Sequence, residues 1–376
     1  MSIDSGKAVT LSAVTAASTD ARFAAGPGRM AVNLGARLCD EGSDRQVAFL
    51  LCHPNADFSR HCLLPHLARH GVAAFGMATR YINNDLDLLM ERCVQDMGRG
   101  VAFLREQGYE KVVLIGHSGG ASLSCFYQAE AETPTVTTMP DGDPFEMGAL
   151  DRADGLILLA AHPSRAQALT SWLDPAIVDE GDPARRDPAL DLFTDRPVPY
   201  DRAWLATFRA AQVARNRRIS DHALAVLDDL RRRPDGPDDA ILTVHGTSAD
   251  PRFIDPTLDP NGRQARSVAQ VARLNETHLS MGRLSTLRSW LSQWSLDHSR
   301  ADGPACLGRT KAPAALIEFE KDDIVFPSYI RSYAEARPDG VHTEMMPGAT
   351  HFLTGQTEVQ DRLARRVVEL ARSQCA

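Results

Sequence analysis

Long apolar runs and a surplus of positive charge are both missing from this sequence. The 376 residues include 41 Lys and Arg against 49 Asp and Glu, which gives a formal net charge of −8. A chain with this balance has no large basic field to attract nucleic acid or an anionic membrane. The longest strongly apolar stretch, residues 156–161, is far shorter than the roughly 20 residues that span a bilayer. The expected partner is therefore a small-molecule substrate, and a homo-oligomer is compatible with the sequence.

Paired cysteines are also lacking. The seven cysteines are scattered and odd in number, and no Cys-x-x-Cys pair is present to begin a metal site. The first 25 residues carry Asp4, Lys7 and Asp20 and lack the continuous apolar segment of a signal peptide. We expect a reduced, cytoplasmic location, with no metal and no cofactor.

Short apolar runs alternate with segments of helical length through the first half of the chain. The runs cover residues 47–52, 72–76, 112–115 and 156–161, and the helical segments cover residues 63–69, 87–107 and 121–130. The runs are continuous rather than alternating, which is typical of strands buried on both faces. Repeated strand, helix and strand predict an α/β fold with a doubly wound, mostly parallel sheet. Residues 9–14 and 30–38 are weaker candidates for leading antiparallel strands.

This rhythm breaks after Pro163 and resumes near residue 311. The intervening segment, residues 164–310, has long helical patterns, the clearest at residues 200–233 and 280–299. Strands are again predicted at residues 314–319 and 341–346, followed by a helix over residues 359–372. The prediction is a core of residues 1–163 and 311–376, interrupted by a mainly helical insertion. All four tryptophans lie in the insertion, where they either fill its core or line an apolar pocket.

A Gly-x-Ser-x-Gly motif directly follows one predicted strand. Residues 112–115 lead into Gly116-His117-Ser118-Gly119-Gly120 and then into a helical segment, the context of a nucleophile elbow. The nucleophile of such a turn has a strained backbone, and side chains on the two glycines would crowd the flanking strand and helix. Ser118 is the candidate nucleophile, and His117 is expected to pack locally.

A serine hydroxyl needs a base within reach and a group that orients the base. His351 is the candidate base, because it lies in a loop after the last predicted strand. Asp322 follows the preceding strand and is the preferred acid, with Asp323 next and Asp250, inside the insertion, as a more distant alternative. His162 follows a core strand and is expected to border the site.

These motifs resemble those of the α/β-hydrolase superfamily. The resemblance covers residues 30–163 and 311–376, and the insertion falls where that family has its cap domain. It implies an oxyanion hole formed by backbone N–H groups of Gly119 and of the segment Cys52-His53-Pro54-Asn55-Ala56. Pro54 replaces the glycine of the family and has no N–H, so Asn55 becomes the expected second donor.

The expected activity is serine-dependent hydrolysis of a carboxylic ester or lactone through an acyl-enzyme, with a bulky or aromatic substrate. The same triad also serves hydrolases of carbon–carbon bonds in diketone-like substrates, thioesterases and amidases, so these remain alternatives. A non-catalytic ligand receptor is a further alternative, but such proteins typically lack a triad member, and all three candidates are present here. The acyl and alcohol groups do not follow from the sequence.

Overall fold

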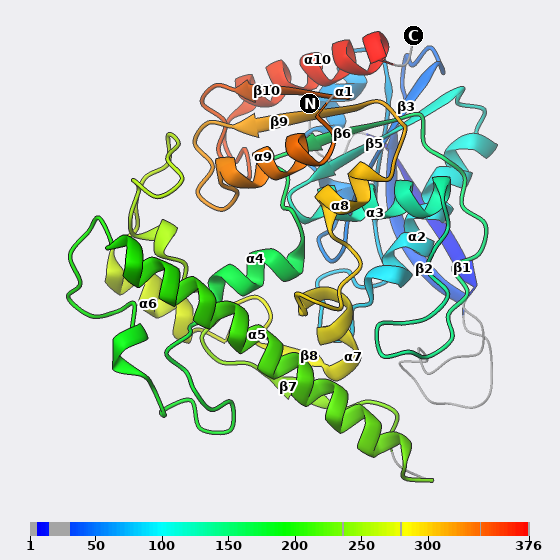
Figure 1. The fold of residues 1–376 in the computed structure, drawn as a ribbon. Coiled ribbons are helices and arrows are strands. Elements are labelled where there is room, and N and C mark those ends of the chain that lie inside the picture. The colour runs from blue at the N-terminus through cyan, green and yellow to red at the C-terminus, as the bar shows by residue number, and fades with distance from the viewer. Residues whose placement is uncertain (1–5, 15–30, 235–236, 279, 339, 375–376) are drawn as a thin grey trace.

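A mixed eight-stranded sheet forms the centre of the computed structural model, which describes residues 6–14, 31–234, 237–278, 280–338 and 340–374 (Figure 1). Asp4, Asp20, the seventh cysteine, Cys375, and the first residue of the expected strand 30–38, Met30, lie outside the described residues. The strands are β1 (Lys7–Val14), β2 (Ala31–Cys39), β3 (Val47–His53), β4 (Ala73–Ala78), β5 (Lys111–His117), β6 (Gly155–Leu159), β9 (Ala314–Phe319) and β10 (Val341–Met346).

The strand order β1-β2-β4-β3-β5-β6-β9-β10 places β5 near the middle of the sheet. β1 pairs with β2, and β2 with β4, in antiparallel fashion, whereas every pair from β4 to β10 is parallel. The predicted α/β class and mostly parallel sheet are therefore confirmed. Because parallel strands end at one edge of a sheet, the loops that follow β3, β5, β6, β9 and β10 gather there.

Two helical layers cover the sheet, and each buries one set of alternating side chains. Phe49 and Leu51 of β3 pack with one layer, whereas Leu50 and Cys52 pack with the other, as the period of two in a strand requires. The first layer contains α1 (Leu64–Arg69) and α10 (Thr357–Gln374). The second contains α2 (Met90–Glu106), α3 (Gly119–Glu132), α8 (Gly303–Gly308) and α9 (Pro327–Ala336). Both faces are thus buried, which explains the continuous apolar runs.

Most of the segment between β6 and β9 extends beyond the sheet, as the green and yellow elements of Figure 1 show. It contains α4 (Arg165–Trp172), α5 (Arg202–Arg231), α6 (Val268–Glu276), β7 (Ile241–Thr243), β8 (Leu284–Thr286), α7 (Leu287–Ser289) and a π-helical turn at Trp290–Trp294. This segment also has short 3₁₀ turns at Pro188–Leu190 and Pro251–Phe253, and a further 3₁₀ turn, Phe58–Arg60, follows β3. The last helix of the segment, α8, returns to the core and packs against α3 and α9.

The single helix expected over residues 280–299 is wrong. Leu284–Thr286 pairs instead with Ile241–Thr243 as a small antiparallel ribbon, and the helical turns begin only after Thr286, which caps α7. The apolar spacing was real, because Leu287, Leu291 and Trp294 do pack in the core of the insertion, but strand pairing determined the first part. Among the described residues, every helix is too short or too polar to cross a lipid bilayer.

Candidate active site

Ser118 occupies a sharp turn between β5 and α3. Its backbone has φ 57° and ψ −125°, a conformation that L-residues rarely adopt. A Cβ on Gly116 would lie 2.5 Å from the Cα of Ala121, and one on Gly120 would lie 2.4 Å from the carbonyl oxygen of Cys52. The two glycines therefore permit the close approach of α3 to the sheet that exposes the Ser118 side chain in the strained turn.

Three loops bring Ser118, His351 and Asp322 into one hydrogen-bonded line. His351 Nε2 lies 3.0 Å from Ser118 Oγ, and His351 Nδ1 lies 2.8 Å from Asp322 Oδ2. The other carboxylate oxygen, Asp322 Oδ1, accepts hydrogen bonds from the backbone N–H groups of Ile324 and Val325, each at 2.8 Å. Both His351 and Asp322 are buried. This arrangement holds a carboxylate behind the imidazole and leaves Nε2 facing the serine.

The two alternative acids have other partners. Asp323 forms an ion pair with Arg266 at 2.6 Å and is about half exposed. Asp250 is fully buried and pairs with Arg209 and Arg252, both at 2.7 Å, and these two cations hold the pKa of its carboxyl well below its usual range. Within the described part of the chain, neither carboxylate hydrogen-bonds to a histidine.

A second chain of hydrogen bonds, formed by His61 and His117, supports the backbone of His351. His117 Nε2 lies 2.9 Å from the carbonyl oxygen of His351, and His117 Nδ1 lies 3.0 Å from His61 Nε2. A carbonyl only accepts, so His117 donates from Nε2 and accepts at Nδ1 from His61, whose own Nδ1 accepts the N–H of Leu63 at 3.3 Å. Burial lowers the pKa of both rings, that of His61 to about 4, so this relay of neutral rings fixes the loop of His351.

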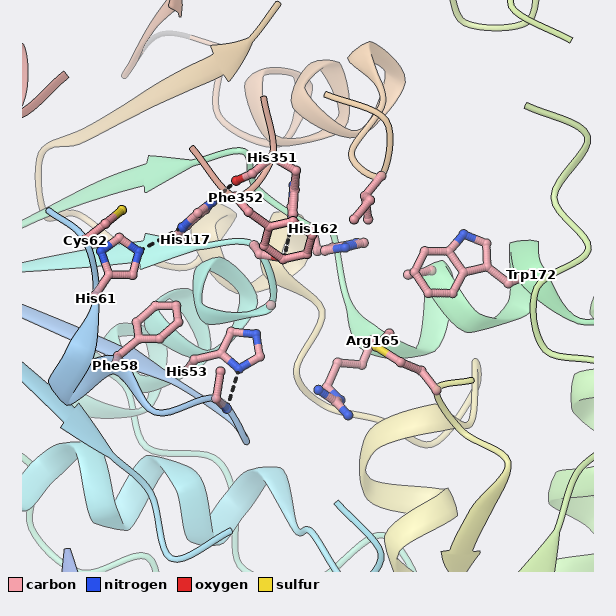
Figure 2. A pocket seen from close by; sticks show the side chains of 16 residues that line it. His53, Phe58, His61, Cys62, His117, His162, Arg165, Trp172, His351 and Phe352 are labelled. Carbon is pink, nitrogen blue, oxygen red and sulfur yellow. Dashed lines mark hydrogen bonds between the residues drawn. The ribbon is translucent and has the colours of Figure 1, made fainter. Parts of the chain in front are cut away.

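A cavity of about 390 Å³ opens over Ser118. Figure 2 shows Phe58 and His61 at one end and Trp172 at the other, with His351 and Phe352 between them. The remaining residues that line it are His53, Ala56, Cys62, His117, Gly119, His162, Arg165, Ala168, Met281 and Ile324. Apart from its histidines and one arginine, this is an apolar space of the size that holds a small organic molecule.

Only Trp172 of the four tryptophans lines this cavity. Trp290 and Trp294 are fully buried in the core of the insertion, and Trp204 packs against Tyr200 and Phe208. The tryptophans therefore divide between the two expected roles, with three of them in packing and one at the cavity.

Arg165, the first residue of α4, is the one formally charged side chain among the cavity-lining residues described here. It is 5% exposed, donates to Asp85 Oδ2 at 2.7 Å and to Asn55 Oδ1 at 3.2 Å, and lies 4.2 Å from the ring centre of Trp294. These contacts link the insertion to the loops after β3 and β4. Sequence reasoning missed Arg165, although its position directly after a core strand and the Ser164 cap was a usable signal.

His162 also lines the cavity, as expected from its place after β6. Its side chain is 95% buried, and burial lowers its pKa to about 3. His162 Nδ1 has no hydrogen-bond partner among the described residues. The ring is therefore neutral and faces Trp172 and Tyr329, with centroids 6.0 Å away in each case.

The two expected oxyanion donors are placed differently. Gly119 is the first residue of α3 and lines the cavity beside Ser118, where the N–H groups of a first helical turn have no acceptor within the helix. The N–H of Asn55 points to the ring of His53, 3.3 Å from its Nδ1, and Asn55 is not among the residues that line the cavity. The role of Asn55 as an oxyanion donor stays a prediction, and its N–H group already has the ring of His53 as an acceptor.

No group of three or more His, Cys, Asp or Glu side chains in the described ranges is arranged to hold a metal ion.

No protein-family model and no curated protein matches the chain. The solved structures that resemble it include two that are matched over almost their full length. The structure of DcsB in complex with its substrate analogue has a TM-score of 0.51, 13% identity, and coverage of 99% of both chains. The α/β hydrolase GrgF from Penicillium sp. sh18 has a TM-score of 0.50, 12% identity, and coverage of 98% of this chain and 100% of its own.

Proposed function

The chain has the α/β-hydrolase fold, and from this premise we propose that it is a serine hydrolase that cleaves a carboxylic ester or lactone through an acyl-enzyme. One observation carries the proposal. The strained Ser118, the ring of His351 and the buried Asp322 form a continuous hydrogen-bonded line, and Ser118 and His351 line an apolar cavity. A fold alone does not define chemistry, but this constellation is one that catalyses acyl transfer.

In the proposed reaction, Ser118 Oγ forms a bond with the acyl carbon while His351 Nε2 takes the hydroxyl proton. The π electron pair moves to the carbonyl oxygen, and the Gly119 N–H is a donor for the resulting oxyanion. The intermediate then collapses, the bond to the alcohol oxygen breaks, and His351 gives its proton to that oxygen. Water repeats the sequence in the second half, and Ser118 Oγ is released and regains its proton. Ester and water become acid and alcohol, and no cofactor is required.

The insertion supports a bulky or aromatic substrate. Residues 164–310, which we propose to be the cap, contribute Arg165, Trp172 and Met281 to the cavity walls, while Ile324 and Phe352 come from the second core segment. Phe352 is 67% exposed and Met281 37%, so the apolar lining continues to the surface. Apolar groups on both sides of the scissile bond would be removed from water here, at about 25 cal/mol for each Å² buried.

The first test is covalent labelling of the purified protein with a fluorophosphonate, followed by peptide mapping of the label. We expect the label on Ser118. Hydrolysis of a panel of p-nitrophenyl esters, aromatic lactones, thioesters, anilides and a vinylogous diketone then assigns the bond type.

The matched variants are Ser118→Ala and Ser124→Ala. Ser124 is a buried serine on α3 whose hydroxyl has no hydrogen-bond partner among the described residues, so its loss should leave turnover unchanged. Ser118→Ala should lower kcat by about 10⁶ with folding preserved. Near-normal turnover in Ser118→Ala would end the serine-hydrolase proposal.

A further inference from the structure

His53, the last residue of β3, lines the same cavity as Ser118 and Gly119. It has no role in the hydrogen-bonded line described above. Its surroundings nevertheless determine both the position of its proton and the direction in which that proton points.

The proton of His53 is on Nε2. Nδ1 lies 3.3 Å from the backbone nitrogen of Asn55 and 3.0 Å from that of Ala56, and both N–H groups donate to it. Because Nδ1 accepts these bonds, the neutral ring must carry its hydrogen on Nε2. Burial lowers the pKa of His53 well below its usual value, and the positive charge of Arg165 lowers it further. His53 is thus a neutral donor with a single N–H to offer.

That N–H lies beside Gly119. A Cβ built on Gly119 would be 2.9 Å from His53 Nε2, closer than to the other atoms of the ring. Gly119 follows the nucleophile, and its own N–H belongs to the first turn of α3. The ring of His53 and the backbone of Gly119 are therefore neighbours in the cavity that both line together with Ser118. Figure 2 shows the guanidinium of Arg165 turned toward His53 from the opposite wall.

We propose that the side-chain Nε2–H of His53 is the second donor of the oxyanion hole, acting with the Gly119 N–H. This rests on the proposed acyl transfer at Ser118. It explains how the hole is completed although Pro54 has no N–H and the Asn55 N–H is directed to His53 Nδ1. It also explains the absence of a side chain at position 119, since a Cβ there would lie 2.9 Å from His53 Nε2, the proposed donor atom. His53 is then a catalytic residue that contacts the developing oxyanion.

The test uses a matched pair of variants. The Asn side chain places its Oδ1 near the position of His Nδ1, so His53→Asn keeps an acceptor for the loop N–H groups and removes the donor. The Gln side chain reaches the position of His Nε2 with an N–H, so His53→Gln keeps the donor. His222→Ala, an exposed position on α5, controls for loss of a histidine.

The readout is kcat for a p-nitrophenyl ester and for its thiono analogue, in which sulfur replaces the carbonyl oxygen. Sulfur is a weak hydrogen-bond acceptor, so an intact oxyanion hole favours the oxygen ester. We expect His53→Asn to lower kcat for the oxygen ester by about 10²–10³ with KM little changed, and to reduce the preference for oxygen over sulfur. His53→Gln should retain most of kcat and most of that preference.

Two outcomes would overturn the assignment. One is a His53→Asn protein with kcat and oxygen preference equal to those of the unmodified protein. The other is a loss of kcat that is largest in His53→Gln, which lacks the acceptor for the loop N–H groups, with the oxygen preference unchanged in both variants; this would show a role in folding the loop only. Fluorophosphonate labelling of Ser118 in the unmodified protein separates the two levels. If Ser118 is labelled normally but the His53 variants give one of these two outcomes, only the His53 assignment is overturned. If Ser118 is not labelled, the proposed function is overturned as well.

Discussion

Replacing Asp322 by Asn is expected to change which nitrogen of His351 carries the proton. The backbone N–H groups of Ile324 and Val325 both donate to Asp322 Oδ1 at 2.8 Å, so an amide at this position must keep its oxygen there. Its NH₂ group then replaces Oδ2, the atom 2.8 Å from His351 Nδ1. Two donors cannot share that contact, and the ring must accept at Nδ1 and carry its hydrogen on Nε2.

This tautomer directs an N–H at Ser118 Oγ and cannot take the serine proton. The expected loss in kcat is about 10⁴, as found when the tautomer of a triad histidine is reversed with its geometry intact. At 1.36 kcal/mol for each factor of ten, this corresponds to about 5.4 kcal/mol in the activation free energy. The fold should survive, because the bonds to the two N–H groups are kept.

The assay is ester hydrolysis by Asp322→Asn, Asp323→Asn and Asp250→Asn, with thermal unfolding of each. Asp323→Asn removes a half-exposed ion pair with Arg266, and such pairs contribute little to stability. The variant should therefore keep kcat within about twofold of the unmodified protein. Asp250→Asn removes the buried carboxylate that pairs with Arg252 and with the partly exposed Arg209, and should cost about 3–5 kcal/mol of stability. Normal turnover in Asp322→Asn, with the loss in one of the other two, would refute the reasoning and move the acid role.

The remaining predictions concern stability and selectivity. Burial lowers the pKa of His61 to about 4 and of His162 to about 3, so below pH 6.5 the unfolded state binds more protons, and stability present above that pH is lost as pH falls. For His61 and for His162, this effect should lower the free energy of unfolding by about 1.4 kcal/mol when the pH falls from 7.5 to 5.5, as measured by urea unfolding. Equal free energies of unfolding at the two pH values would contradict this prediction. Trp172→Ala should lower kcat/KM for aromatic esters more than for the acetate, whereas Trp204→Ala, away from the cavity, should not; equal selectivity in all three proteins would count against the proposed pocket. Gly116→Ala puts a methyl group 2.5 Å from the backbone of α3 and should cost at least about 1–3 kcal/mol, seen as a lower Tm; an unchanged Tm would show that the helix can move away.

Local sequence determined the strands of the core and the long helix of the insertion. The strands at residues 314–319 and 341–346 were predicted with the bounds that the structure has, and α5 within two residues at each end. These elements follow from side-chain periodicity, which acts within a few residues. The elbow at Ser118 was recognisable for the same reason, because its glycines are needed within one turn of the nucleophile.

Tertiary structure decided the direction of individual side chains. Asp322 and Asp323 are adjacent in one turn, yet one faces His351 and the other faces Arg266. Residues 284–286 form a strand instead of the predicted helix, because they pair with a strand that begins 43 residues earlier (284 minus 241). His61 meets His117 across 56 positions, and no local pattern signals such a contact. Periodicity assigns a residue to a buried or exposed face, but the atom that a side chain meets depends on where separate loops converge, and only the assembled sheet edge determines that.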